Sequence, residues 1–261
     1  MNIFHALIFG IVEGVTEFLP ISSTGHLMLT AQVLGLSQTE FLKTFEIVIQ
    51  FGAILSVIVL YWRTLFINIE ALKRVIIAFI PTAVLGLIFY KVIKHFLMGT
   101  SQVVLWSMFI GGICLIVFEL VHKEKDNALE DISSISYRTS LLIGLFQSIA
   151  MIPGVSRSAA TIVGGLVLGL KRKTIVEFSF LLAVPTMLAA TALDLIKNVN
   201  QFSTAQINFL SIGFILSFVF ALLSVKFLLN FIKHHSFISF GIYRIILALS
   251  FWIFSSSIGF F

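Results

Sequence analysis

Two glutamates lie in an apolar stretch near the N-terminus, where ionisable side chains are unfavourable and are functional candidates. Glu13 and Glu17 are four residues apart, so on a helix they share one face. Two like charges so placed repel each other unless a proton or a cation lies between them. Carboxylate oxygens suit Mg²⁺ or Ca²⁺, and we predict that both glutamates bind a divalent cation. The alternative is that one of them lies at a helix end and faces water.

A cluster of hydroxyl groups and a histidine follows directly. Ser22, Ser23 and Thr24 precede His26. Hydroxyl groups ahead of a helix cap its first turn, and the free N–H groups there bind anions. Capping explains the hydroxyls but not His26, which adds a base or a nucleophile. Three alternatives stay open: His26 activates Ser23, His26 activates water, or His26 itself attacks.

An arginine lies in a second apolar stretch, far along the chain. Arg157 is flanked by Ser156 and Ser158, with Thr161 one helical turn on. The guanidinium fork binds phosphate with two parallel hydrogen bonds, and the hydroxyls add donors. We predict that these four side chains bind an anionic substrate. The alternative is an ion pair from the arginine to one of the two N-terminal glutamates.

Glu46 and Gln50 lie four residues apart on one face of the next predicted helix. Gln50 is predicted to line the same cavity and contact the substrate. Hydrogen bonds between helices are the alternative for both side chains.

The composition defines the surroundings of these residues. Hydrophobic residues make up 59% of the 261 residues and charged residues 11%, against about 25% charged in ordinary soluble domains. Mean hydropathy is +1.09. Cys114 is the single cysteine, so no disulfide forms within the chain. These values exclude a disordered chain or a nucleic-acid-binding module and predict one polytopic membrane domain over residues 1–261.

Six apolar segments are long enough to cross a bilayer as helices, since about 20 residues span its core. They are about 44–62, 75–95, 101–122, 174–196, 208–229 and 239–260. Two further apolar stretches, about 2–36 and 140–170, break in the middle at a proline and a hydroxyl cluster. Non-helical backbone at membrane depth needs surrounding protein or a wet cavity. We therefore predict an all-α integral membrane protein with six transmembrane helices and two re-entrant helix hairpins.

The two hairpins resemble each other, which indicates an internal repeat. Gly10 to Glu13 parallels Gly144 to Gln147, and Pro20 and Ser23 parallel Pro153 and Ser156. The copies are predicted to span about 1–122 and 139–261. One hairpin plus three spans per copy makes the two copies inverted in the membrane. Paired broken helices in such repeats usually form the site near the midplane.

Basic residues support this topology, because cytoplasmic loops are enriched in lysine and arginine. Most of the 17 fall in four segments predicted to be inside: Arg63, Lys73, Arg74, Lys123, Lys125, Arg138, Lys171, Arg172, Lys173, Lys226, Lys233 and Arg244. Those predicted outside are Lys43, Lys91, Lys94 and Lys197. Arg157 is then the single basic residue without a loop.

Two motifs carry a family resemblance. The run from Glu13 to Leu27, EGVTEFLPISSTGHL, and the run from Pro153 to Thr161, PGVSRSAAT, together resemble the undecaprenyl-diphosphatase family associated with bacitracin resistance. The likeness covers the whole chain. Ala159 is a small departure, at a position where glycine is common in the family.

The resemblance implies a multi-pass hydrolase of the bacterial plasma membrane, acting at its outer face. The enzyme would remove the terminal phosphate of undecaprenyl diphosphate and release the monophosphate carrier for peptidoglycan synthesis. It would need a divalent cation. The family's functional residues fall on Glu13, Glu17, Ser23, His26, Ser156, Arg157 and Thr161. The lipid substrate and the membrane are the expected partners, nucleic acid is not, and a homodimer is an open alternative.

Two other functions were weighed. A second lipid-phosphatase superfamily also carries Gly-His and Ser-Arg motifs, but there a histidine follows the arginine by six residues, and Val163 occupies that position here. The alternative in another class is a polyprenyl-phosphate flippase or ion-coupled transporter, because inverted repeats and broken helices are also typical of transporters.

Overall fold

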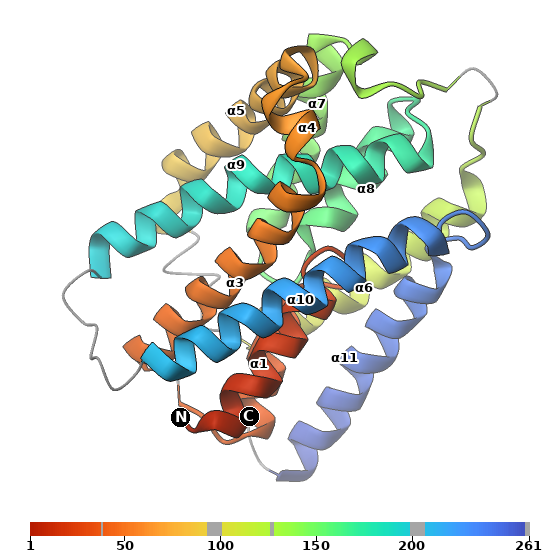
Figure 1. Cartoon of the computed structure of the whole chain (residues 1–261). Helices are drawn as coiled ribbons and strands as arrows, with labels where there is room; N and C mark the ends of the chain where they lie inside the picture. Colours follow the sequence, from red (N-terminus) through yellow and green to blue (C-terminus); the bar gives the residue numbers. More distant parts are fainter. Residues whose placement is uncertain (38, 93–100, 126–127, 199–206, 259–261) are drawn as a thin grey trace.

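The computed structural model describes the chain except residues 38, 93–100, 126–127, 199–206 and 259–261, and within this part every regular element is a helix. The helices in Figure 1 are α1 (Ile3–Thr16), α2 (Ser23–Val33), α3 (Glu40–Leu60), α4 (Trp62–Phe66), α5 (Ile69–Val92), α6 (Ser101–Val121), α7 (Tyr137–Ser148), α8 (Arg157–Val167), α9 (Arg172–Asn198), α10 (Ile207–Phe231) and α11 (Ile238–Ile258). Short 3-10 turns cover Ile132–Ser134 and Ile149–Met151. The described part of the chain is therefore all-α, as predicted.

Five helices are long and apolar enough to cross a membrane, judged by length and composition within the described residues. They are Glu40–Leu60, Ile69–Phe89, Ser101–Val121, Arg172–Ala192 and Ile207–Phe231. Each corresponds to a predicted span. The apolar part of the C-terminal helix that the structure describes, Ile238–Ile253, is shorter. The ends of predicted spans 75–95 and 239–260 lie outside the described residues.

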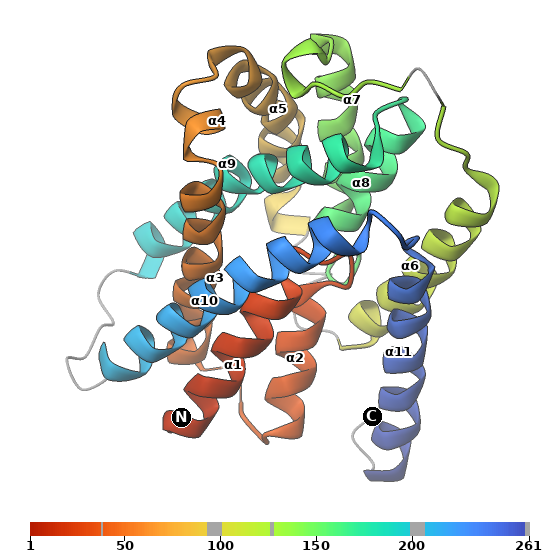
Figure 2. The same ribbon diagram turned by 45° about the vertical axis from the view of Figure 1, so that its right-hand side comes forward.

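The two stretches predicted as hairpins each form a pair of short helices. Figure 2 shows α1 and α2 in the lower half of the molecule and α7 and α8 in the upper half, with the connecting turns meeting between them. The Ser158 hydroxyl at the start of α8 donates to the Leu19 carbonyl in the first turn, over 2.9 Å. The two turns are thus in direct contact, although more than a hundred residues separate them in the sequence.

Proline and glycine account for the interruption of both pairs. Pro20 has no N–H group and disfavours helical backbone at Leu19, so the chain turns after α1. In the second pair, Gly154 has φ +93° and lies against the backbone of α6, where a side chain would overlap the Val104 carbonyl. Only glycine combines that backbone conformation with so close an approach.

The two short helices α2 and α8 begin with the same local structure. Ser22 and Ser156 are the N-cap residues, with φ of 73° and 77°, and they are the non-glycine residues at positive φ among those described. The sequence comparison matched Ser156 with Ser23, but the backbone matches it with Ser22. Pro20 lies two residues before its N-cap serine, whereas Pro153 lies three residues before its own. Aligning the two prolines therefore paired the wrong serines. By backbone position, Ser23 therefore corresponds to Arg157.

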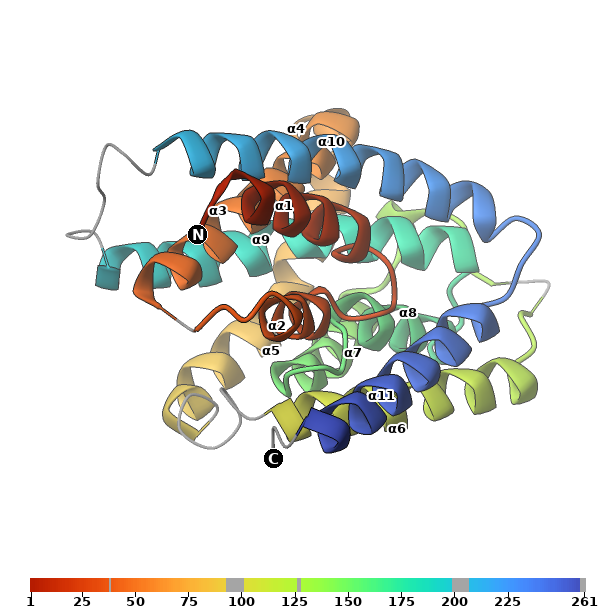
Figure 3. The same ribbon diagram turned by 90° about the horizontal axis from the view of Figure 1, so that it is seen from below.

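Packing between helices follows a reciprocal pattern. Helix α1 packs on α10 as α7 packs on α5, and α10 packs on α3 as α5 packs on α9. Helices α3 and α9 pack on each other, as do α6 and α11. Seen from below in Figure 3, α2 lies between α1 and α10 on one side and α6 and α11 on the other. The hairpins are thereby enclosed by longer helices.

The surface and the core have the composition expected in lipid. Large apolar side chains are exposed along the long helices, for example Leu87 on α5, Leu120 on α6 and Ile215 on α10. Contiguous exposed apolar surface of this kind marks contact with a membrane. Phe18 and Phe180 are fully buried in the main core and meet edge to face at 5.5 Å.

One basic residue lies elsewhere than predicted. Arg244 was assigned to an inside loop, but it lies within α11 and is fully buried. Arg157 is therefore not the single basic residue inside the protein. The loop assignment was wrong because a helix starts six residues before Arg244, at Ile238, and charge counting along the sequence cannot detect that its side chain turns inward.

Candidate active site

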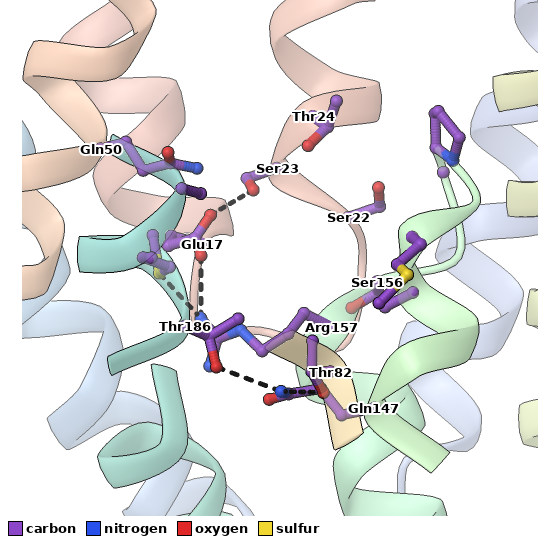
Figure 4. A pocket seen from close by; sticks show the side chains of 16 residues that line it. Glu17, Ser22, Ser23, Thr24, Gln50, Thr82, Gln147, Ser156, Arg157 and Thr186 are labelled. Carbon is purple, nitrogen blue, oxygen red and sulfur yellow. Dashed lines mark hydrogen bonds and ion pairs between the residues drawn. The ribbon is translucent and has the colours of Figure 1, made fainter. Parts of the chain in front are cut away.

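A cavity of about 190 Å³ lies where the turns of the two hairpins meet. Figure 4 shows polar side chains pointing into it from both hairpins and from α3, α5 and α9. Seven of the predicted site residues line the cavity: Glu17, Ser22, Ser23, Thr24, Gln50, Ser156 and Arg157. Each hairpin contributes some of them, so neither hairpin forms the site alone.

A line of three side chains crosses the cavity. The Ser23 hydroxyl donates a short hydrogen bond to Glu17 Oε2, while Arg157 Nη2 donates to Glu17 Oε1 over 2.8 Å (Figure 4). One carboxylate thus binds the hydroxyl of the first hairpin and the guanidinium of the second. All three side chains are largely buried, and such charge-assisted bonds are strong where water is excluded.

The guanidinium is held from several sides but keeps donors for a ligand. Arg157 Nη1 donates to the Ser179 carbonyl over 2.9 Å, and the group lies over the Phe18 ring at 5.7 Å. The side chain is 14% exposed and borders the cavity. Arginine has five N–H donors, so an anion in the cavity can replace Glu17 as the acceptor without displacing the other contacts.

Two helix N-termini also face the cavity. Helix α2 begins at Ser23 and α8 begins at Arg157, and both residues line it. The first N–H groups of a helix lack intrahelical acceptors and carry partial positive charge. Together with the guanidinium, they make the cavity suitable for an anion with several oxygens, such as a phosphate.

His26 hydrogen-bonds to other partners than Ser23, the contact that one of its three predicted roles requires. It does not border the cavity; Nδ1 donates to the Ser22 carbonyl over 2.8 Å, and Nε2 lies 2.8 Å from the Tyr243 hydroxyl. Its ring also stacks on Tyr243, with the ring planes 5° apart. A carbonyl only accepts, so in a neutral imidazole Nε2 must accept from the tyrosine. Both nitrogens are occupied, and Ser23 has Glu17 as its partner instead.

The predicted metal ligand Glu13 lies behind the cavity. It is 1% exposed, and neither of its carboxylate oxygens has a hydrogen-bond partner. Two partnerless buried oxygens on hard ligands fit the donor chemistry of Mg²⁺ or Ca²⁺. The described residues include no cluster of three or more His, Cys, Asp or Glu side chains placed to bind a metal. Water and phosphate oxygens would have to supply the remaining ligands.

The other predicted substrate ligands of the second hairpin hold the backbone. Thr161 is fully buried and donates to the Arg157 carbonyl over 2.9 Å. Ser158 donates to the Leu19 carbonyl and lies 3.3 Å from the Ser156 hydroxyl. Neither Ser158 nor Thr161 borders the cavity. Both side chains fix the residues that do.

A polar wall opposite Ser23 was missed by sequence reasoning. The Gln147 amide donates to the Thr82 and Thr186 hydroxyls over 2.9 and 3.1 Å, and all three side chains line the cavity (Figure 4). In the sequence, the only signal at Gln147 is that it is the repeat counterpart of Glu13. Thr82 and Thr186 carry no signal in the sequence, because single threonines within apolar helices are common.

Fold and cavity together define a helical, multi-pass membrane protein with a polar cavity between two pairs of short helices. Residues 6–250 match the family described as Bacitracin resistance protein BacA, and the chain belongs to this family. It is 54% identical over 249 residues to a protein of Aquifex aeolicus named undecaprenyl-diphosphatase, covering 95% of this chain and 97% of that protein.

Two further relatives bear the same name. The chain is 51% identical to the undecaprenyl-diphosphatase of a Sulfurihydrogenibium species over 253 residues, or 97% of this chain and 99% of that one. It is 50% identical to that of Wolinella succinogenes over 251 residues, or 96% and 97%. These names agree with the family resemblance that the two motifs indicated. They give no support to the transporter alternative.

Proposed function

We propose that this protein is a membrane phosphatase that removes the terminal phosphate of undecaprenyl diphosphate and leaves undecaprenyl phosphate. The observation that carries the proposal is the line from Ser23 through Glu17 to Arg157 inside a buried cavity. The names of relatives at 50–54% identity identify the substrate class. Phosphoryl transfer depends mainly on positioning and charge neutralisation, and both are present here.

Substrate binding and activation of the hydroxyl are linked through Glu17. When the diphosphate enters, Arg157 exchanges the carboxylate for phosphate oxygens. In this scheme the Glu17 carboxylate takes a proton, because its Oε2 already accepts from the Ser23 hydroxyl. Its hydrogen-bonded neighbour Ser23 is the group that loses that proton.

The transfer then proceeds in two balanced steps. The Ser23 oxygen bonds to the terminal phosphorus, the bond from that phosphorus to the bridging oxygen breaks, and undecaprenyl phosphate leaves. Glu17 takes the hydroxyl proton. Water next attacks the phosphorus of the phosphoserine, and the bond from that phosphorus to the Ser23 oxygen breaks. Glu17 returns its proton to the serine oxygen, and inorganic phosphate leaves with the protons of the water. Glu17, rather than His26, is the base in this scheme; His26 orients the Ser22 carbonyl at the start of α2.

A divalent cation, Mg²⁺ or Ca²⁺, is part of the proposal. Glu13 and Glu17 would bind it, and it would neutralise charge on the phosphate oxygens. Chelation is expected to abolish phosphate release, and added Mg²⁺ or Ca²⁺ to restore it. In a Glu13→Gln variant the cation concentration for half-maximal activity should rise about tenfold or more. Unchanged activity after thorough chelation would contradict a cation requirement.

The architecture belongs to the same proposal. The chain forms a single polytopic domain with six spans and two re-entrant hairpins, arranged as an inverted repeat in the bacterial plasma membrane with the site reached from the outer face. Two observations support the repeat: the matching N-caps at Ser22 and Ser156, and the reciprocal packing of α1 on α10 and α7 on α5. The basic loops support the orientation.

The direct test is phosphate release by the purified protein in detergent, with undecaprenyl or farnesyl diphosphate as substrate. Release that needs the cation supports the proposal, and its absence under all cation conditions would refute it. Labelling with substrate carrying ³²P in the terminal phosphate, followed by rapid denaturation, identifies the nucleophile. Phosphoserine survives acid whereas phosphohistidine does not, so acid-labile label would assign the attack to His26.

A further inference from the structure

The two turns leave backbone carbonyl groups at membrane depth, where water is scarce and each needs a donor. The Pro20 carbonyl of the first turn lies outside the helices, and so do the Gly154 and Val155 carbonyls of the second. A single side chain donates to all three, and it belongs to neither hairpin: Arg244 of α11.

Every donor of Arg244 is used in this way. Nη1 donates to the carbonyls of Pro20 and Val155 over 3.4 and 3.0 Å. Nη2 donates to those of Gly154 and Ser107 over 3.0 and 3.1 Å, and Nε to that of Met108 over 3.3 Å. The five N–H groups of the guanidinium are thus matched by five carbonyl oxygens.

This arrangement is unlike that of two partly buried arginines. Arg157 pairs with Glu17 and Arg172 with Glu119, but among the described residues no carboxylate is paired with Arg244. Removing a guanidinium from water is unfavourable unless its donors are all satisfied. Here the compensation comes from the backbone of both turns and of α6, so the contact stabilises one relative placement of these three segments.

Helix α6 has space for this group because it has a glycine there. A Cβ atom on Gly111 would overlap the Arg244 guanidinium. Ser22 lies two residues after Pro20 and Ser156 directly follows Val155, and both serines line the cavity. A Cβ at position 111 would displace the guanidinium, and a shorter side chain at position 244 would leave carbonyls of the turns without a donor.

We propose that Arg244 is a positioning residue that holds the two hairpin turns in register, and that Gly111 provides the space for its guanidinium. Arg244 does not border the cavity and does not contact the substrate. Its effect reaches the reaction through the spacing between Ser23 on one turn and Arg157 on the other. The kinetic part of this inference rests on the proposed phosphatase function; the structural part does not.

Two variants test the proposal in different ways. Arg244→Lys keeps the charge but has three donors at one point, which cannot reach all five carbonyls. Gly111→Ala keeps the arginine and raises the helix propensity of α6, but displaces the guanidinium. Arg172→Lys and Gly86→Ala are matched controls, because Arg172 pairs with Glu119 away from the turns and a Cβ on Gly86 meets only an ordinary contact at 3.6 Å.

Two measurements are made on each purified full-length variant. For phosphate release, kcat should fall roughly tenfold to a hundredfold in Arg244→Lys and Gly111→Ala while KM changes by less than about threefold, since misplacement by about 1 Å has effects of this size. In hydrogen exchange followed by mass spectrometry, peptides over 18–24 and 152–157 should exchange faster in both variants and in neither control.

The outcomes separate the alternatives. If Arg244 acts only through its charge, Arg244→Lys leaves kcat close to that of the parent, and the proposal is wrong. Normal exchange of both turns in Gly111→Ala, with normal kcat, also overturns it, and this holds even if Arg244→Lys cannot be recovered folded. If the parent protein releases no phosphate, the proposed function fails, while the exchange comparison still decides whether Arg244 holds the turns.

Discussion

A single carboxylate decides how the site works. Glu17 accepts from Ser23 with one oxygen and from Arg157 with the other. The candidate nucleophile and the guanidinium are therefore linked through one side chain. His26 has both nitrogens occupied by Ser22 and Tyr243. The proton acceptor that we propose for Ser23 is therefore already in contact with it, without any movement of the histidine.

Glu17→Gln is expected to lower kcat for phosphate release by about a hundredfold or more, because the amide keeps the shape but cannot take the proton. His26→Gln is expected to lower kcat by less, since it disturbs the position of Ser22 without removing the base. The measurement is steady-state phosphate release by both variants in detergent. A larger loss of kcat in His26→Gln than in Glu17→Gln would contradict this prediction and indicate that His26 is the base.

Ser23→Ala is expected to lower kcat at least a thousandfold, because the attacking oxygen is lost. Thr24→Ala is the matched control: Thr24 is the next residue, also lines the cavity and also carries a hydroxyl. We expect that control to stay within about tenfold of the parent. Equal, small losses in both variants would exclude Ser23 as the nucleophile and favour water.

The two broken helix pairs place these side chains by means of their caps. Ser22 and Ser156 take a positive φ and cap α2 and α8 by accepting from the N–H groups of Gly25 and Ala159. The next position of each copy holds a different side chain, Ser23 in one and Arg157 in the other. A duplicated turn thus supplies the hydroxyl from one side of the cavity and the guanidinium from the other.

Ser22→Ala is expected to lower the free energy of unfolding by about 1–2 kcal/mol, because the cap is lost and the positive φ remains. Ser22→Gly should lower it by only a few tenths, because glycine accepts that backbone without strain. Thermal unfolding of both variants in one detergent gives the comparison. Equal stability of the two would show that the backbone at Ser22 carries no strain.

Close contact between helices also depends on small residues. A Cβ on Gly10 of α1 would approach the Gly213 carbonyl of α10 to 2.7 Å, so Gly10→Ala must separate the helices. We expect a loss of about 1–3 kcal/mol in the free energy of unfolding. Gly86→Ala, which meets no such obstacle, should be neutral or slightly stabilising. Unfolding in detergent compares the two variants, and a neutral Gly10→Ala would contradict the observed packing.

The molecule as a whole buries its polar site and exposes its apolar helices. Side chains such as Leu87 and Ile215 face outward, while Glu17 and Arg157 meet in the interior. The proposed inverted arrangement makes the two ends of the molecule chemically different, with most basic loop residues at one end. Orientation in the membrane follows from that difference.

Single cysteines test the orientation. In a Cys114→Ser background, which should retain near-normal activity because Cys114 is exposed on a lipid-facing helix, Ser37→Cys and Ser134→Cys place thiols on exposed residues of opposite predicted sides. We expect a membrane-impermeant maleimide to label position 37 in intact cells and position 134 only after permeabilisation. Labelling of both in intact cells would contradict the inverted repeat.

The amino-acid sequence alone identified the class of protein and seven of the residues that line the cavity. Apolar length predicts membrane helices because the bilayer core has a set thickness, and the charged side chains inside apolar stretches, such as Glu17 and Arg157, mark the site because they are unfavourable there. Those properties depend on residue type and local spacing, which the sequence contains. The two motifs then identified the family.

Tertiary structure decided which of these residues meet. In the folded protein Ser23 donates to Glu17 and not to His26, and Arg244 lies in the core and not in a loop. Thr82, Gln147 and Thr186 also line the cavity. Each of these depends on where a helix face points after packing against helices from the other half of the chain. Such contacts join residues that are distant in sequence, so local pattern does not contain them.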